Sequence, residues 1–395
     1  MSYLVLARKW RPQVFEDVVG QGHITKTLQN AISSGRIAHA YLFSGPRGVG
    51  KTTVARILAK ALNCVKGPTP TPCNDCQRCK GITSGFSVDV LEIDGASNTG
   101  VDNVRELREN IRYLPSQGGY RVYIIDEVHM LSVSAFNALL KTLEEPPSHA
   151  VFVFATTEVY KIPRTVLSRC QRFDFRRIPL KDIQAHTMHI AESEGIDIDD
   201  MSLYLIAREA EGSMRDALGF LDQVVSYAGA VIRKEHVLEA LGLMDRAFLH
   251  QIAEGILREK GGDCLNVIEK VFNFGYDIKR FCQELLEYIR DLVIVKAVEE
   301  PKGLLDLPDS EVEGLRGLSE LVSFPHLQMM FNILHRGYEE ISRSTSPRFL
   351  LEMTVLRIAH LDKVQPLSTI LEGLERLERD GGMSLRSGGS NSISA

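Results

Sequence analysis

Short apolar runs alternate with helical patterns along the first part of the chain. Five such runs are rich in β-branched and aromatic residues and show little polar alternation, which is typical of strands buried on both faces of a parallel sheet. They cover residues 40–44, 88–93, 121–125, 150–155 and 172–175. Because helical stretches separate them, the pattern predicts an α/β domain over residues 1–178, with helices on both faces of a parallel sheet.

The strand pattern ends at Pro179, and helical spacing continues alone. Four helical stretches predict a compact helical block over residues 179–243. They are residues 181–193, 201–210, 214–227 and 234–241. Longer helices, for example at residues 278–298 and 326–341, predict a third, all-helical domain over residues 244–368. The remaining residues 369–395 form a tail whose end is rich in glycine and serine, and we expect that end to be disordered.

The bulk composition narrows the class of protein. A chain of 395 residues is too long for one ordinary core, and 44% hydrophobic with 25% charged residues is usual for a globular protein. The sequence has no run of about 18 apolar residues and starts without the layout of a signal peptide, so we expect a cytoplasmic protein with no membrane partner. The net charge of −5 argues against a surface covered with positive charge for binding nucleic acid. The first sixty residues are locally basic, with nine basic and two acidic residues. This excess fits either phosphate-binding chemistry with ordinary solvated lysines or a surface that faces DNA, and both stay open.

A phosphate-binding loop follows the first predicted strand and opens a predicted helix at residues 51–62. Residues 45–52 match the pattern G-x-x-x-x-G-K-[ST] in the context that the motif requires. Glycines let backbone N–H groups close around phosphate, and the helix N-terminus adds a positive dipole end. Lys51 is predicted to reach the β- and γ-phosphates of ATP, and the Thr52 hydroxyl to bind Mg²⁺. The predicted ATP contacts of the loop are Gly45, Pro46, Arg47, Gly48, Val49, Gly50, Lys51, Thr52 and Thr53.

An acidic pair, Asp126 and Glu127, follows the third predicted strand. A carboxylate at that position can hold the Mg²⁺ through water, which gives Asp126 a role. Glu127, one residue on, is suited to orient and deprotonate the attacking water. An acidic pair after a strand is often only a strand end, but its combination with the phosphate-binding loop predicts ATP hydrolysis.

Four of the seven cysteines crowd one short window between the predicted P-loop helix and the second strand. Prolines within the window keep it out of a continuous helix. Four thiolates at these spacings suit a closed, tetrahedral zinc site with a structural role. The alternatives are reduced buried cysteines or a redox pair, and a redox pair needs no further cysteines beside it. The predicted zinc ligands are Cys64, Cys73, Cys76 and Cys79.

Short motifs along the chain match, in order, those of the gamma/tau subunits of the bacterial DNA polymerase III clamp loader. They are residues 7–12, 18–21, 39–45, 126–131, 137–147, 168–170 and 212–218, together with the four-cysteine insertion. The sequence is therefore identified as a member of that family, strongly over residues 1–243 and more weakly as far as residue 361. Long members of the family continue into domains that bind the replicative helicase and the polymerase, whereas this sequence ends at Ala395.

The resemblance implies an AAA+ ATPase with a zinc module, a helical lid and a helical collar. It also implies partners: other copies of the chain, delta and delta-prime subunits in an open ring, the β sliding clamp, and primer-template DNA onto which ATP-driven loading places the clamp. By the family pattern, Thr157 is the polar sensor beside the γ-phosphate, and Arg215 is the second sensor, reaching its own ATP from the lid. Arg169 is the arginine finger that completes a neighbour's ATP site. The adenine lies near Val18 and Val19.

Three other functions fit parts of the sequence. The letters of residues 126–129 also match the D-E-x-H signature of some helicases, but such a helicase needs a second sheet domain where this chain is helical. A branch-migration AAA+ motor would need neither the cysteine insertion nor residues 168–170. A clamp-loader subunit that serves only as a scaffold generally has a damaged P-loop, whereas the motif here is intact.

Overall fold

The structure is a computed structural model that describes residues 4–97, 109–111, 113–117, 119–301, 303–305 and 307–361. The chain divides into two compact units, Met1–Leu241 and Gly242–Ala395. The tail predicted over residues 369–395 lies outside the described residues. None of the helices in the described part is long and apolar enough to cross a membrane.

A five-stranded parallel sheet forms the centre of unit 1, in the order β2-β3-β4-β1-β5. Its strands are β1 (Ala40–Ser44), β2 (Val90–Asp94), β3 (Arg121–Asp126), β4 (Ala150–Thr156) and β5 (Gln171–Asp174). Each lies within two residues of an apolar run in the sequence, so these five predicted strands are confirmed. Because β4 lies between β3 and β1, the residues that follow these strands meet at one edge.

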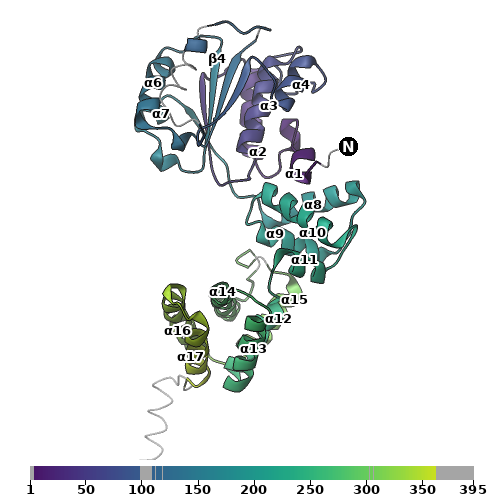
Figure 1. The fold of residues 1–395 in the computed structure, drawn as a ribbon, viewed down its shortest axis with the longest axis vertical. Coiled ribbons are helices and arrows are strands. Elements are labelled where there is room, and N and C mark those ends of the chain that lie inside the picture. The colour runs from purple at the N-terminus through teal and green to yellow at the C-terminus, as the bar shows by residue number, and fades with distance from the viewer. Residues whose placement is uncertain are drawn as a thin grey trace, which may run out of the picture. The chain divides into compact units, whose positions relative to one another are not determined.

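Helices cover both faces of the sheet, as the apolar runs predicted (Figure 1). On one face lie α2 (Gly22–Ser33) and α3 (Lys51–Asn63), and on the other α6 (Val133–Glu144) and α7 (Arg164–Leu167). Side chains of β1 alternate between the two cores: Tyr41 and Phe43 pack on the α3 side, and Leu42 packs on the α6 side. Burial on both faces explains why the strands read as continuous apolar runs.

Two smaller helices flank the α3 side of the sheet. Helix α1 (Leu6–Lys9) belongs to the N-terminal segment, which continues through the 3-10 turn Phe15–Asp17. Helix α4 (Gln77–Ser84) lies inside the cysteine-rich insertion, where the Cys76 sulfur accepts a hydrogen bond from the amide of Cys79 at the helix start. Single 3-10 turns, Val128–Met130 and Val159–Lys161, follow β3 and β4.

The remainder of unit 1 is the helical block predicted after Pro179. It contains α8 (Leu180–Glu194), α9 (Asp200–Glu209), α10 (Met214–Ala228) and α11 (Lys234–Leu241). The prediction that strands end at Pro179 was incomplete, because β6 (Asp197–Ile198) and β7 (Val231–Ile232) pair in parallel. Two-residue strands are too short to show a periodic pattern, so only the tertiary pairing reveals them.

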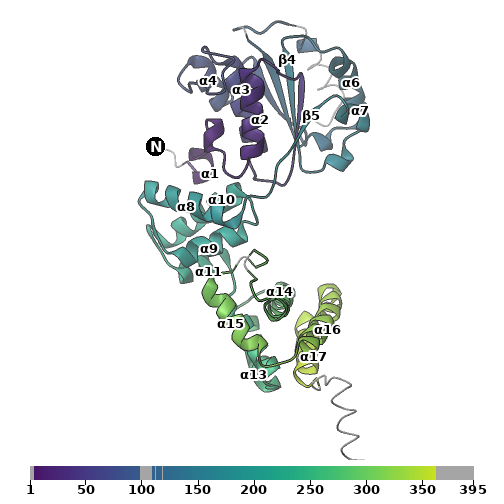
Figure 2. The same cartoon turned by 180° about the vertical axis from the view of Figure 1, so that it is seen from behind.

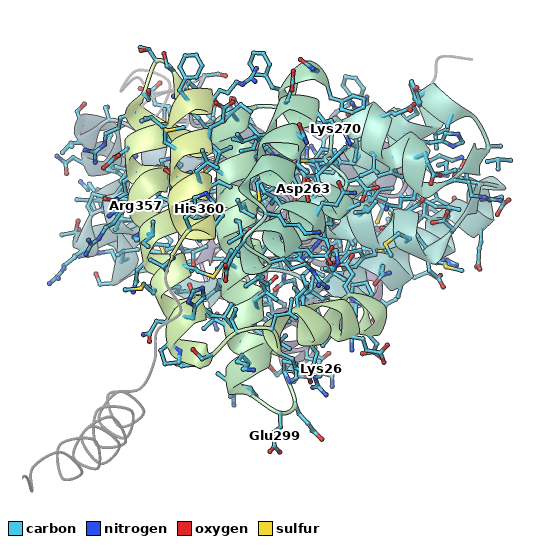
Figure 3. The ribbon with its side chains drawn as sticks, turned by 90° about the horizontal axis from the view of Figure 1, so that it is seen from below. Lys26, Asp263, Lys270, Glu299, Arg357 and His360 are labelled. Atoms are coloured by element: carbon cyan, nitrogen blue, oxygen red, sulfur yellow. The ribbon has the colours of Figure 1, made fainter. Side chains whose placement is uncertain are left out.

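Unit 2 is all-helical over its described residues (Figure 2). Its helices are α12 (Arg246–Leu257), α13 (Gly261–Asn273), α14 (Ile278–Ala297), α15 (Asp309–Ser319), α16 (Phe324–Arg343) and α17 (Pro347–Ala359). The start of α13 packs tightly on α17: a Cβ at Gly261 would lie 2.8 Å from Leu356 and 3.5 Å from His360. Figure 3 labels Asp263 of α13 and His360, which follows α17, and the close approach of these two helices explains why residue 261 is a glycine.

Candidate nucleotide site

The P-loop runs from the end of β1 into α3, and two of its glycines have no room for a side chain. A Cβ at Gly45 would lie 2.4 Å from the Phe175 carbonyl oxygen, and one at Gly48 would lie 1.8 Å from Ser213 Oγ. Both residues also have positive φ, at 147° and 76°. The loop therefore lies against the segment after β5 on one side and the start of α10 on the other, with its backbone open to a phosphate.

Lys51 is the first residue of α3 and is only 6% exposed. Its ammonium donates hydrogen bonds to the carbonyl oxygens of Gly45 at 2.8 Å and Pro46 at 2.7 Å, so it lies under the loop that precedes it. Burial lowers the pKa of Lys51, while the charges of Glu127 and Asp126 oppose the shift. A phosphate here would meet a cation that is already desolvated, which strengthens charge–charge attraction.

Thr52 and Asp126 are brought together from separate elements. The Thr52 hydroxyl donates to Asp126 Oδ2 at 2.6 Å, joining the first turn of α3 to the end of β3. Hydroxyl and carboxylate oxygens are the ligands that Mg²⁺ takes in P-loop enzymes. The two predicted metal contacts therefore lie within one ion's reach of each other.

Glu127 follows with a left-handed backbone, φ 44°, and its carboxylate faces the end of β4. The hydroxyl of Thr157 donates to Glu127 Oε2 at 3.2 Å, and the Thr157 amide lies 3.4 Å from the same oxygen. Thr156, by contrast, is fully buried within β4. The geometry thus makes Thr157 the threonine that contacts the acidic pair.

His129 is a member of this cluster to which the sequence reasoning gave no role. Its Nε2 lies 3.0 Å from Glu158 Oε2, and its Nδ1 lies 3.0 Å from Thr156 Oγ1 and 3.3 Å from Glu127 Oε2. The side chain is only 7% exposed. Each ring nitrogen of His129 therefore lies near a carboxylate oxygen, and Nδ1 also lies near the Thr156 hydroxyl. The letters D-E-x-H pointed to this residue, because His129 lies in the 3-10 turn that directly follows Glu127.

Helix α10 meets the P-loop at its N-terminus. Ser213 caps the helix by accepting from the Asp216 amide, and the Arg215 amide donates to the Gly48 carbonyl at 3.4 Å. The Arg215 side chain is exposed at this junction. On the opposite side, Val18 is buried and its Cγ1 lies 3.8 Å from the Cβ position of Gly50, while Val19 is partly exposed. Gly48 of the P-loop therefore neighbours the lid, and Gly50 neighbours the N-terminal segment.

Arg169 is the predicted site residue that the structure places elsewhere. It precedes β5, whose Gln171 pairs with Tyr41 of β1, so it lies toward the amino end of the strands, whereas the P-loop follows their carboxyl end. Its guanidinium donates to Glu144 Oε1 at 2.7 Å and to the Thr165 carbonyl at 2.6 Å. The side chain is 31% exposed. Arg169 therefore belongs to a different surface from Lys51.

The four cysteines predicted to bind metal converge between α3 and α4. Their sulfur atoms all lie within 4.8 Å of one another, as a single tetrahedral ion would require. Amides of Cys73, Cys76 and Cys79 donate to the sulfurs of Cys64, Cys73 and Cys76 at 3.4 to 3.5 Å.

The surroundings lower the pKa of one of these thiols, Cys76, and raise the pKa of another, Cys79. Burial raises the pKa of Cys76. Hydrogen bonds have a larger, opposite effect and lower the pKa to about 6; they come from the amides of Val65 and Cys79 and from neighbouring thiols. Burial raises the pKa of Cys79, with the neighbouring thiols adding to the effect. Amide donors favour the thiolate form, which is the form that binds metal.

Comparisons with known proteins agree on one family. Three family models match: "DNA polymerase III, delta subunit" over residues 20–179, "DNA polymerase III clamp loader subunit, ATPase lid domain" over residues 182–230, and "DNA polymerase III subunits gamma and tau domain III" over residues 232–374. The DNA polymerase III subunit tau of Bacillus subtilis is 44% identical over 384 residues, covering 95% of this chain and 68% of the relative. The chain belongs to the gamma/tau family of bacterial DNA polymerase III subunits.

Two further matches complete the comparison of this gamma/tau chain. The subunit tau of Escherichia coli is 41% identical over 367 residues, covering 93% of this chain and 57% of the relative. A solved structure of the RuvB Holliday junction branch migration motor of Thermotoga maritima overlaps with a TM-score of 0.46 at 19% identity, covering 63% of this chain and 79% of that one. The family assignment rests on the sequence relatives and the family models alone.

Membership of the family confirms the main predictions from the sequence. The chain is an AAA+ ATPase subunit of the DNA polymerase III clamp loader, with a parallel-sheet ATPase domain, a helical lid and an all-helical domain. A member of this class binds a nucleotide with Mg²⁺ and hydrolyses ATP. The helicase, branch-migration and scaffold-only alternatives are set aside.

Proposed function

We propose that ATP bound between the P-loop and α10 drives this chain to open the β sliding clamp and load it onto primed DNA, in the cytoplasm. Its partners would be other copies of the chain and the delta and delta-prime subunits. The observation that carries the proposal is the Thr52–Asp126 contact of 2.6 Å, one residue from the buried ammonium of Lys51. A cation and a hydroxyl from the start of α3 and a carboxylate from the end of β3 converge where a metal-bound phosphate would lie.

Each residue near the P-loop then has a role in ATP hydrolysis. Backbone N–H groups of residues 45–53 bind phosphate, and Lys51 neutralises the β- and γ-phosphate charge. Thr52 and Asp126 hold Mg²⁺, which when bound bridges phosphate oxygens and offsets their charge. Val18 and Val19 offer an apolar surface to the adenine.

The chemical step is assigned to Glu127 and its neighbours. Glu127 accepts a proton from the attacking water on a carboxylate oxygen. Thr157, whose hydroxyl lies 3.2 Å from that carboxylate, is the polar sensor that contacts the γ-phosphate. Arg215 lies at the lid–loop junction, where its side chain is free to turn toward phosphate. Arg169 acts in trans on the ATP of an adjacent subunit, consistent with its distance along the strands from its own P-loop.

The four-cysteine cluster fits a structural zinc ion. Four sulfurs within 4.8 Å fill a tetrahedral coordination shell and leave no position for a reacting water. When bound, the metal supplies cross-linking between the end of α3 and the start of α4, with no part in hydrolysis. Metal analysis of protein purified without added metal should find one zinc per cluster. Four freely reactive thiols in folded, zinc-free protein would contradict this assignment.

The ATPase proposal is tested by measuring hydrolysis with the purified chain alone, and then with primed DNA, clamp and the other loader subunits. We expect slow hydrolysis alone and strong stimulation in the complete mixture. Lys51→Ala should lower both because it weakens ATP binding, whereas Lys26→Ala, at an exposed lysine of α2, should lower neither. ATP binding with no hydrolysis under any of these conditions would contradict the motor role.

A further inference from the structure

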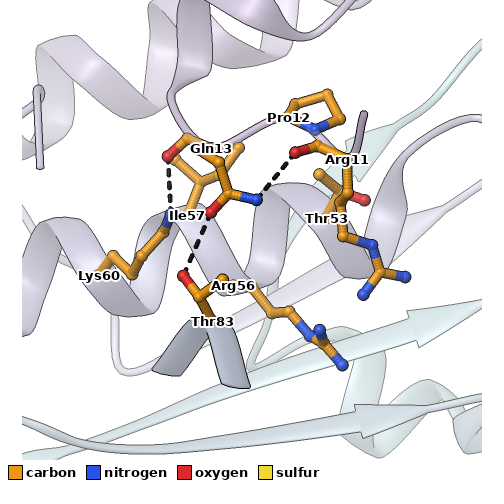
Figure 4. Close-up of a pocket in the computed structure, with 8 residues that line it drawn as sticks. All are labelled: Arg11, Pro12, Gln13, Thr53, Arg56, Ile57, Lys60 and Thr83. Carbon is orange, nitrogen blue, oxygen red and sulfur yellow. Dashed lines mark hydrogen bonds between the residues drawn. The ribbon is translucent and has the colours of Figure 1, made fainter. Parts of the chain in front are cut away.

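Lys60 is a buried cation whose position suggests a role beyond packing. It lies on α3, nine residues after Lys51, and is 1% exposed. Its ammonium donates to the carbonyl oxygen of Gln13 at 2.8 Å, to Gln13 Oε1 at 2.8 Å and to Asn74 Oδ1 at 2.7 Å. All three acceptors are amide oxygens, so neutral groups from two distant segments hold this charge inside the protein. Figure 4 shows Lys60 beside Gln13.

The cysteine module surrounds one side of Lys60. Asn74 lies between Cys73 and Cys76 in a left-handed conformation, φ 54°, and the Lys60 carbonyl accepts from the Cys64 amide at 2.8 Å. Burial lowers the pKa of Lys60 to about 8, against the opposing charges of Cys79 and Asp17. Four thiolates around a divalent ion carry a net charge of about −2, which a nearby ammonium offsets.

The N-terminal segment occupies the other side, and Gln13 is its point of attachment. The Gln13 side chain accepts from Lys60, accepts from the Thr83 hydroxyl of α4 at 3.2 Å, and donates to the Arg11 carbonyl at 2.8 Å. Figure 4 shows these bonds in one hollow beside α3, which Arg11 and Arg56 also line. The segment is thereby attached to both helices that flank the cysteine module.

The same segment is attached to the lid at its other end. The Leu6 amide donates to Asp222 of α10 at 2.7 Å, and Lys9 and Trp10 both donate to the Glu194 carboxylate of α8 at 2.7 Å. Between the two attachments, burial and the charges of Arg56 and Arg215 lower the pKa of Arg11. A continuous set of contacts therefore joins the cysteine module, α3 and the lid.

We propose that Lys60 and Gln13 are positioning residues that couple metal binding in the cysteine module to nucleotide binding between the P-loop and the lid. A nucleotide that draws the lid onto the P-loop fixes the N-terminal segment, which holds Gln13 against Lys60 and so favours the metal-bound module. Thermodynamic linkage requires the reverse effect to be equally large. The inference rests on the proposed zinc site and the proposed nucleotide site.

The test is the zinc affinity of the full chain, measured by competition with a chelator, with and without a non-hydrolysable ATP analogue. In the native sequence we expect the analogue to tighten zinc binding by about five-fold or more. Gln13→Met keeps the side-chain volume and removes the Oε1 acceptor and the Nε2 donor, leaving only the main-chain carbonyl bond to Lys60, so it should still bind zinc but show less than about a two-fold effect of the analogue. Gln29→Met is the matched control, because the Gln29 side-chain amide lies on α2 and donates to the exposed Glu16 carboxylate, and it should keep the full effect.

Lys60→Met adds a second measurement. It removes the buried charge, so we expect zinc affinity itself to fall about ten-fold, as for loss of a charge-assisted hydrogen bond. If this variant does not fold, Gln13→Met decides alone. An equal zinc affinity with and without the analogue in the native sequence, an undiminished effect in Gln13→Met, or its loss in Gln29→Met overturns the coupling. Metal analysis and analogue binding on the native chain, made first, separately reveal failure of the zinc assignment or of the nucleotide site.

Discussion

The two ends of the parallel sheet in unit 1 hold their charged residues in different ways. At the carboxyl end, the ammonium of Lys51 is buried and the Thr52–Asp126 contact is 2.6 Å, so the groups are enclosed and contact one another. At the amino end, Arg169 is 31% exposed and its partner Glu144 is 50% exposed. The first arrangement suits the small anionic ligand that we propose, and the second leaves both charged side chains at the surface.

The separation follows from the geometry of parallel strands. A five-residue strand such as β1 spans about 16 Å, more than twice the reach of an arginine side chain. A cation at the amino end therefore cannot serve the phosphates bound at the carboxyl end of its own sheet. The comparison predicts that variants at the two ends fail in different ways: those at the P-loop end within one chain, and those at Arg169 only between chains.

The largest effect is expected for Arg169→Ala. An arginine placed against the transferred phosphoryl group typically raises turnover by about 10³–10⁵-fold, so DNA- and clamp-stimulated hydrolysis should fall by that order. Nucleotide affinity of the isolated chain should change less than about two-fold, since no contact to its own P-loop is lost. Arg172→Ala, at an exposed arginine of β5, is the matched control and should hydrolyse normally.

Mixed rings sharpen this prediction. Arg169→Ala mixed with Lys51→Ala should regain part of the stimulated hydrolysis, because the Lys51→Ala chain lends its Arg169 to a neighbour's intact P-loop. Loss of nucleotide binding by isolated Arg169→Ala, or no recovery in rings shown to be mixed, would make Arg169 a structural residue of its own subunit.

Glu127→Gln should give the next largest loss. The amide keeps the shape of the side chain but accepts no proton, and this role typically contributes about 10²–10⁴-fold to turnover. ATP should still bind, since Lys51 and Thr52 are unchanged. Single-turnover hydrolysis together with equilibrium nucleotide binding separates the two effects, and normal turnover would remove Glu127 from the chemical step.

Lys51→Ala should chiefly weaken the binding of ATP. Hydrogen bonds to charged groups are worth about 1.5–3 kcal/mol, so affinity for ATP should fall by about 10- to 100-fold. Titration with a fluorescent ATP analogue measures this directly. An unchanged affinity with slow hydrolysis would show that Lys51 acts only in the transition state.

His129→Asn should give a smaller loss. Asparagine can replace Nδ1 toward Thr156 but loses the Nε2 bond to Glu158, and one hydrogen bond of about 0.5–1.5 kcal/mol corresponds to a three- to ten-fold change in turnover. Nucleotide affinity should stay constant. Glu158→Gln, which replaces the carboxylate beside Nε2 by an amide, should give a loss of similar size if His129 acts through its orientation. Equal activity of all three proteins would leave His129 as packing only.

Glu144→Gln should have the smallest effect. The side chains of Arg169 and Glu144 are 31% and 50% exposed, so loss of this ion pair should lower the free energy of unfolding by less than about 1 kcal/mol in urea denaturation. Stimulated hydrolysis should be retained, because the guanidinium of Arg169 stays in place. A loss as large as that of Arg169→Ala would mean that the pair itself, and not the cation, is required.

The sheet and the P-loop could be predicted from sequence because both are local patterns. The apolar runs at residues 40–44 and 121–125 lie within one residue of β1 and β3, and the helix predicted from Lys51 ends one residue later than expected. In this chain the phosphate-binding loop is eight consecutive residues, so the chain order already fixes its geometry. The short strands β6 and β7 escaped prediction because two residues carry no period.

What the sequence by itself determined is the order of elements, the P-loop with its acidic strand end, and the set of four cysteines. Only the tertiary structure decided which polar residues from separate elements meet: His129 with Glu158, Thr157 with Glu127, and Lys60 with Gln13 and Asn74. The physical reason lies in how each is encoded. Buried strands and phosphate loops need particular residues at fixed spacing along the chain, whereas a hydrogen bond between segments 14 to 47 residues apart, as at Lys60, depends on where the fold places them.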